Sequence, residues 1–221
     1  MKRVTALLLA AMMIITTGLI APAMAAEDDV PETYSNAYVV MDAKTGQVLL
    51  QKNMYEKEYP ASITKILTTA LGLTYAKPED RITVSQETVS DVWKWGETTH
   101  LALEPGEIIT LKDALYGAMV ESANDCANAI AQAVSGSLTD FAELMNQQVA
   151  ALGLSDTHFT NAHGLPDKDH YTTAYDMARI TRWAMTVPGF EEYFCATEYT
   201  IPKTNKKDVA RNIGTHHHML V

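Results

Sequence analysis

Tyr59-Pro-Ala-Ser-Ile-Thr-Lys-Ile-Leu-Thr-Thr-Ala-Leu-Gly-Leu73 is the stretch on which the interpretation of this sequence rests. Pro60 fits the start of a helix better than its interior, and it disfavours helical geometry for the residue before it. The pattern therefore predicts a helix that begins at or beside Ser62. The apolar residues that follow recur with the period of an α-helix, at Ile66, Leu67, Ala70, Leu71 and Leu73.

Ser62 and Lys65 lie three residues apart in this helix and therefore share one face. A serine hydroxyl is a weak nucleophile until a base removes its proton, and a partly desolvated lysine can be neutral near pH 7 and act as that base. The first turn of a helix also offers unpaired backbone N–H groups to a developing oxyanion. The alternative interpretation is an N-cap followed by a solvated charge, so the pair needs support from elsewhere in the chain.

That support comes from a break in a second helical pattern. Thr110-Leu-Lys-Asp113 resembles a capping box and opens an apolar stripe, which Glu121-Ser-Ala-Asn-Asp125 interrupts with small and polar residues. The interruption predicts a bend at which Ser122 and Asn124 both face a cleft. In an unbroken helix the two side chains would point about 200° apart, and a solvated patch would be the better interpretation.

The first 25 residues have the features of an export signal. Lys2 and Arg3 precede an apolar run from Val4 to Ile20, and Ala23-Met-Ala25 has the small-x-small pattern of a signal-peptidase site. The alternative is an uncleaved membrane anchor, but the run is only marginally long enough to span a bilayer. We therefore predict cleavage after Ala25 and one exported domain over residues 26–221.

The net charge argues against nucleic acid as a partner. The 221 residues include 17 basic and 27 acidic residues, which gives a formal net charge of −10, and removal of Lys2 and Arg3 with the signal takes it to −12. Such an acidic chain repels a phosphate backbone. The charge does not decide whether the protein associates with a membrane.

Cys126 and Cys195 are the two cysteines of the sequence, and an exported chain can join such a pair in a disulfide. Because Cys126 falls in an apolar helical run, two separately buried thiols fit the sequence at least as well. His216-His217-His218 is a cluster of histidines, but consecutive side chains point in different directions and no other ligand type lies close by in sequence. We predict no metal site and no cofactor.

Two short strands, Ala37–Met41 and Gln47–Gln51, are predicted to form a hairpin around Asp42-Ala-Lys-Thr-Gly46, whose glycine can adopt a positive φ. A third short strand is predicted at Arg81–Ser85. The region from there to Gly106 has no clear period and is predicted to be irregular. Its two tryptophans, Trp93 and Trp95, fit a small satellite core better than a binding groove.

The remaining helices are predicted from residues that typically begin or end a helix. Ser137 is predicted to cap a helix that Gly153 ends, and Thr173-Ala-Tyr-Asp176 opens another helix that stops before Pro188. Alternation of apolar residues from Thr197 to Ile201 predicts a strand.

Taken together, Pro60-Ala-Ser-Ile-Thr-Lys65 and Glu121-Ser-Ala-Asn-Asp125 resemble two of the three motifs of penicillin-binding enzymes, Ser-x-x-Lys, Ser-x-Asn and Lys-Thr-Gly. The resemblance is to the low-molecular-weight penicillin-binding proteins that act as serine D-alanyl-D-alanine carboxypeptidases, and it covers the chain from Tyr38 to the end. Further segments similar to that family are Asp42–Leu49, Leu103–Glu107, Leu152–Leu165 and Thr173–Asp176.

The resemblance implies a fold and four roles. The fold is an α/β sandwich in which an antiparallel sheet is flanked by helices, beside a mostly helical lobe. Ser62 would be the nucleophile that forms an acyl ester, with its own backbone N–H as half of the oxyanion hole, and Lys65 would accept its proton. Ser122 would relay a proton toward the leaving amine, and the Asn124 amide would hold both the substrate and Lys65. The implied partners are peptidoglycan stem peptides ending in D-Ala-D-Ala, with β-lactam antibiotics as acylating inhibitors.

The third motif is where the sequence departs from the family. Lys44-Thr45-Gly46 precedes the nucleophile and fits an ordinary turn, and Lys203-Thr204-Asn205 lacks the glycine. We therefore interpret the domain as incomplete at its C-terminus and expect weak activity or none from these 221 residues. Two alternatives stay open at this point: a serine β-lactamase, and a non-catalytic fragment that binds peptidoglycan.

Overall fold

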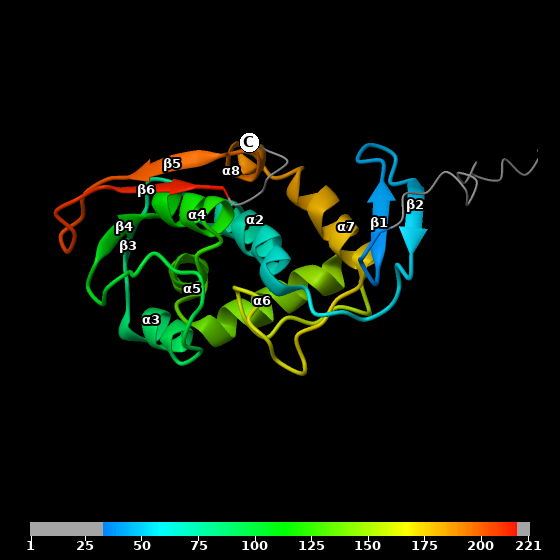
Figure 1. Cartoon of the computed structure of the whole chain (residues 1–221), viewed down its shortest axis with the longest axis horizontal. Coiled ribbons are helices and arrows are strands. Elements are labelled where there is room, and N and C mark those ends of the chain that lie inside the picture. Colours follow the sequence, from blue (N-terminus) through cyan, green and yellow to red (C-terminus); the bar gives the residue numbers. More distant parts are fainter. Residues whose placement is uncertain (1–32, 216–221) are drawn as a thin grey trace, which may run out of the picture. The chain divides into compact units, whose positions relative to one another are not determined.

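A computed structural model of the chain describes residues 33–215 (Figure 1). The predicted export signal and His216–His218 lie outside the described residues.

Helix α2 (Lys65–Tyr75) is the helix against which most of the other helices pack, and it follows a 3-10 turn, η2 (Ala61–Thr64). This confirms the predicted helix start beside Ser62. Gly72 explains the close approach of a neighbouring helix, since a Cβ there would lie 2.9 Å from the Ile130 side chain. The helix is buried along most of its length because helices contact it from several sides.

Four of these helices begin at side-chain caps. Thr110 forms the predicted capping box at the start of α4 (Leu111–Val120), and Ser137 and Thr173 cap α6 (Leu138–Ala151) and α7 (Ala174–Ala184). Ser85 caps α3 (Gln86–Trp93). The other three α-helices of the described residues lack a side-chain cap: α2, α5 (Asn124–Ser135) and α8 (Phe190–Phe194).

The described strands form three separate antiparallel pairs. The hairpin β1 (Tyr38–Met41) and β2 (Val48–Lys52) contacts α7, while β5 (Glu198–Ile201) and β6 (Arg211–Gly214) pair over α4. The third pair is β3 (Arg81–Thr83) with β4 (Ile108–Thr110). Helices and small antiparallel sheets thus make up an α/β fold, as expected, although the predicted flanked sheet is present as separate hairpins.

Two main groups of buried apolar side chains hold the helices together. One joins α4 and α5 to the strands β3 to β6 and includes Leu115 and Ile130; the other joins α2, α5, α6 and α7 and includes Leu67 and Phe141. Helix α5 contributes to both groups. Its first turn carries Asn124, so the position of that side chain is set by both halves of the core.

Two expectations about the region from Arg81 to Gly106 were wrong. The region after Arg81–Ser85 is not all irregular, because Gln86–Trp93 forms α3 with Val89 and Val92 buried. Trp93 and Trp95 are exposed to 50% and 42%, so they form no satellite core, and neither lines the cleft described below.

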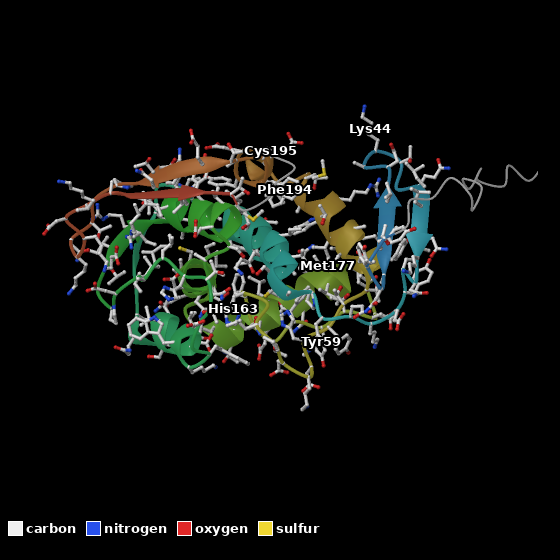
Figure 2. All side chains as sticks on the ribbon, viewed as in Figure 1. Lys44, Tyr59, His163, Met177, Phe194 and Cys195 are labelled. Atoms are coloured by element: carbon white, nitrogen blue, oxygen red, sulfur yellow. The ribbon has the colours of Figure 1, made fainter. Side chains whose placement is uncertain are left out.

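Cys126 and Cys195 are both free, so they form no disulfide. Cys126 is buried where α5 packs on α4, with its Sγ only 2.5 Å from the place a Cβ of Gly117 would occupy. Cys195 is exposed after α8, which contradicts the expectation of two buried thiols (Figure 2).

Candidate active site

The turn that carries Ser62 has an unusual backbone. Ala61 has a φ of +49°, which is uncommon for a residue with a side chain, and Ser62 follows it in η2. Gly164, with a φ of +88°, packs directly on this turn, because a Cβ at Gly164 would lie 1.8 Å from the Ala61 carbonyl oxygen. Only glycine fits at this point, so the loop after α6 fixes the backbone on which the Ser62 hydroxyl is placed.

The predicted bend between two helices is present. Helix α4 ends at Val120, Ser122 has a φ of +59°, and α5 begins at Asn124. The Ala123 N–H donates to the Gly117 carbonyl, and the Asn124 N–H donates to the Thr99 carbonyl at 2.9 Å. These bonds turn the Ser122 and Asn124 side chains toward one site, as the sequence predicted.

Lys65 joins the two motifs. Its Nζ lies 3.2 Å from Ser62 Oγ and 3.5 Å from Ser122 Oγ, and it donates to Asn124 Oδ1 at 2.7 Å. A fourth oxygen, the backbone carbonyl of His163, accepts from it at 2.8 Å. All four residues predicted for the site thus meet at one lysine nitrogen.

The electrostatics of Lys65 favour a base. Its side chain is 2% exposed, and the four oxygens around its Nζ are neutral. Burial lowers its pKa from an ordinary 10.5 to about 7, although the nearby Asp125 opposes this shift. At neutral pH a large fraction of Lys65 is therefore uncharged and has a lone pair available for a proton.

A cleft of about 300 Å³ opens over these groups. It is lined by the Ser62 turn, Glu97–Thr99, Asn124, and the loop His163–Pro166. Ser62 is exposed to this space whereas Lys65 lies beneath it. A substrate in the cleft would therefore meet the hydroxyl, while the lysine stays out of water.

His170 supports the Ser62 turn and was not singled out from the sequence. Its Nδ1 accepts from the Thr160 N–H at 3.1 Å, so its proton is on Nε2, which donates to Thr64 Oγ1 at 2.9 Å. Burial lowers the pKa of His170 to about 4 and keeps the ring neutral. No spacing motif links His170 to Thr64, so only the folded chain reveals the contact.

Both Lys-Thr strings lie away from the cleft. Lys44 is at the tip of the β1–β2 hairpin, where Figure 2 shows its side chain pointing away from the helices, and Gly46 has the positive φ expected of a turn. Thr204 donates its hydroxyl to Glu107 at 2.9 Å in a separate polar cluster near β6. Neither string therefore supplies a third motif to the site.

Within residues 33–215 no cluster of three or more His, Cys, Asp or Glu side chains is arranged to hold a metal ion. No helix of that part of the chain is both long and apolar enough to cross a membrane.

The fold resembles that of penicillin-binding proteins. The structure resembles penicillin-binding protein 6B from Escherichia coli, with a TM-score of 0.77 and 27% identity over 89% of this chain and 62% of that one. It also resembles penicillin-binding protein 5 from Haemophilus influenzae, with a TM-score of 0.75 and 28% identity over 86% of this chain and 55% of that one.

Within that class the chain belongs to the D-alanyl-D-alanine carboxypeptidase family, whose pattern it matches over residues 23–217. It is 34% identical to D-alanyl-D-alanine carboxypeptidase DacF of Bacillus subtilis over 94% of this chain and 54% of the relative. It is 37% identical to DacC of Escherichia coli over 73% of this chain and 43% of the relative. The chain thus spans about half the length of these relatives.

Proposed function

We propose that the protein is a serine-type D-Ala-D-Ala carboxypeptidase that removes the terminal D-alanine from peptidoglycan stem peptides. Family membership supports the reaction class, and one structural observation supports the chemistry. That observation is the buried Lys65, whose pKa is about 7 and whose Nζ lies 3.2 Å from Ser62 Oγ.

The first half of the reaction forms an ester. Neutral Lys65 takes the proton of Ser62 Oγ while that oxygen attacks the carbonyl carbon of the bond between the two D-alanines. The backbone N–H of Ser62 is the expected donor to the oxyanion. Collapse breaks the C–N bond, and the proton held by Lys65 passes through Ser122 to the departing amine. The distance of 3.5 Å from Lys65 Nζ to Ser122 Oγ is compatible with such a relay.

The second half restores the enzyme. Water attacks the ester on Ser62, Lys65 accepts a proton from that water, and the shortened peptide leaves as the Ser62 hydroxyl is reprotonated. Asn124 holds Lys65 through Oδ1 at 2.7 Å, and its amide N–H groups are free to bind the substrate backbone in our proposal. No metal or cofactor is needed for any step.

The partners and location follow from the reaction. We propose that the protein is exported, as its first 25 residues indicate, and acts on peptidoglycan outside the cytoplasm. β-Lactam antibiotics would acylate Ser62 in place of the peptide.

The decisive experiment is to incubate the chain with benzylpenicillin and locate the adduct by mass spectrometry. We expect it on the peptide that contains Ser62. Ser62→Ala should lose labelling by about 10⁴-fold or more, as is typical for removal of a nucleophile. An adduct on Ser122, or full labelling of Ser62→Ala, would refute the assignment.

Two substrates then separate the alternatives. Release of D-alanine from a peptide ending in D-Ala-D-Ala, with little hydrolysis of nitrocefin, supports a carboxypeptidase. Rapid nitrocefin turnover without D-alanine release would indicate a β-lactamase. Binding of the peptide with neither reaction would indicate a non-catalytic binding protein.

A further inference from the structure

His163 contacts Lys65 through its backbone and helix α3 through its ring. Its carbonyl oxygen accepts from Lys65 Nζ at 2.8 Å, and its Nε2 lies 2.9 Å from Oδ2 of Asp91, in α3. The His163 side chain is 2% exposed, whereas the Asp91 side chain is 22% exposed. His163 is labelled in Figure 2; it lies in the loop after α6, and its carbonyl contact places it beside Lys65, the first residue of α2.

The ring is held in a single tautomer. Nδ1 of His163 accepts from the Leu165 N–H at 3.1 Å, which places the ring proton on Nε2 and makes this nitrogen the donor to Asp91. Burial lowers the pKa of His163, which favours the neutral ring, although Asp91 opposes that shift. The ring is thus fixed at both nitrogens.

Asp91 is itself held in place. Its Oδ2 also accepts from Asn128 Nδ2 at 3.0 Å, and its Oδ1 accepts from Lys94 at 2.6 Å. The hydrogen bond from His163, the largest cause, lowers the pKa of Asp91 far below its usual range, so the carboxylate stays ionised. Asn128 belongs to α5, the helix that begins with Asn124. Asp91 therefore ties His163 to the element that also carries an acceptor of Lys65.

We propose that Asp91 and His163 are positioning residues for Lys65, with the Asp91–His163 hydrogen bond fixing the carbonyl that orients its Nζ toward Ser62. The inference rests on the proposed function for its catalytic meaning, but its geometry is independent of turnover. Without the bond, the ring turns, the His163 carbonyl shifts, and water reaches Lys65. A loss of alignment of about 1 Å at a reacting group can reduce a rate by about 10²-fold.

A purely structural role would have a different signature. If the pair only fastened α3 to the loop after α6, its loss would lower thermal stability and leave Lys65 unchanged in the folded protein. The test therefore measures the pKa of Lys65 itself, by NMR of the full chain labelled with ¹³Cε and ¹⁵Nζ lysine. Lys65→Arg identifies its signal. Acylation by benzylpenicillin is measured alongside.

Asp91→Ala should raise the pKa of Lys65 from about 7 by at least about one pH unit, because water replaces the lost carbonyl contact. Acylation at pH 7 should fall by about 10–100-fold. Asp91→Asn keeps an oxygen that accepts from Nε2–H, so it should retain acylation within about threefold. Lys94→Ala removes the outer partner of Asp91 and should leave both readouts unchanged.

His163→Leu removes the same hydrogen bond from its other end and serves if Asp91→Ala does not fold. It should reproduce the higher pKa of Lys65, and the double variant should be no worse than either single one. An unchanged Lys65 pKa in folded Asp91→Ala or His163→Leu would overturn the inference, as would fully additive effects. If no variant or parent is acylated, the proposed function fails while the pKa readout still decides this inference.

Discussion

Two of the buried ionisable side chains, Lys65 and Glu107, have different surroundings. Lys65 is 2% exposed and is surrounded by four neutral oxygens, whereas Glu107 is fully buried and meets the Arg211 guanidinium. Glu107 also accepts from the Thr204 hydroxyl at 2.9 Å and from the Glu104 N–H at 3.0 Å. A guanidinium in direct contact therefore balances the charge of Glu107, whereas only neutral oxygens form hydrogen bonds with Lys65 Nζ.

The difference separates a structural charge, on Glu107, from the lysine that our proposed reaction uses as a base. A buried ion pair with complete hydrogen bonding holds segments together, and near Glu107 it joins β6 to the segment before β4. Burial of a lysine that has no such partner lowers the pKa of the lysine, so that the neutral side chain can accept a proton. The contrast can be tested at four levels, from the largest expected effect to the smallest.

Lys65→Arg should reduce acylation of Ser62 by about 10²–10⁴-fold, because arginine keeps the positive charge but cannot serve as a base. The measurement is the rate of covalent labelling by benzylpenicillin. Lys112→Arg, at a lysine that is 45% exposed, is the control and should label normally. Normal labelling of Lys65→Arg would mean that the site needs only a positive charge. Lys65 would then differ from Glu107 in its surroundings but not in the kind of role it has.

Arg211→Met should lower the free energy of unfolding by about 3–5 kcal/mol, since it leaves Glu107 buried without its cation. Denaturant unfolding measures the loss. Lys207→Met, which breaks the more exposed pair with Glu104, should cost much less, because water screens that pair. Equal losses in the two variants would show that the burial of Glu107 does not determine how much its ion pair contributes to the free energy of unfolding.

Gly164→Ala should disturb the Ser62 turn, because the new Cβ would overlap the Ala61 carbonyl oxygen. We expect a loss of about 1–3 kcal/mol in stability, together with slower acylation of the folded protein. Gly136→Ala is the matched control: Gly136 also has a positive φ, +79°, but nothing lies within 4 Å of its Cβ position. If the two variants behave alike, backbone strain and not the contact with Ala61 explains the result.

The pH dependence of acylation should report Lys65 directly. With a pKa of about 7, its neutral fraction falls about fivefold between pH 7 and pH 6, and acylation should fall with it and level off above pH 8. Acylation that does not change between pH 6 and pH 8 would contradict a lysine base.

Much of the fold could be predicted because its signals are local. The helix caps Thr110, Ser137 and Thr173 are each followed three residues later by an aspartate. The helix start beside Ser62 follows from Pro60 and from the apolar period after it. Helix α3 was missed because it buries only Val89, Val92 and Thr88. Ser85 as its cap was the available signal.

The site could be predicted only as far as side chains define it. The spacing of Ser62 to Lys65 and of Ser122 to Asn124 can be read from the sequence. A backbone carbonyl such as that of His163 gives no such signal, because every residue type has one. Asp91 lies 72 residues from His163 and has no periodic or motif relation to it. The opposite exposures of Cys126 and Cys195 likewise depend on packing that no local pattern contains.

The burial of Lys65 also links folding to proton uptake. An unfolded chain has a lysine pKa near 10.5, and the folded chain has one near 7, so the unfolded state binds more protons between these two pH values. Each molecule that unfolds in that window takes up close to one proton at this residue, and the contribution of Lys65 to the free energy of unfolding rises with pH through it. Below pH 7 both states hold the proton, and the folded state carries the full cost of a desolvated ammonium. Lys65, the base in our proposed reaction, thus lowers the stability of the fold most in acid.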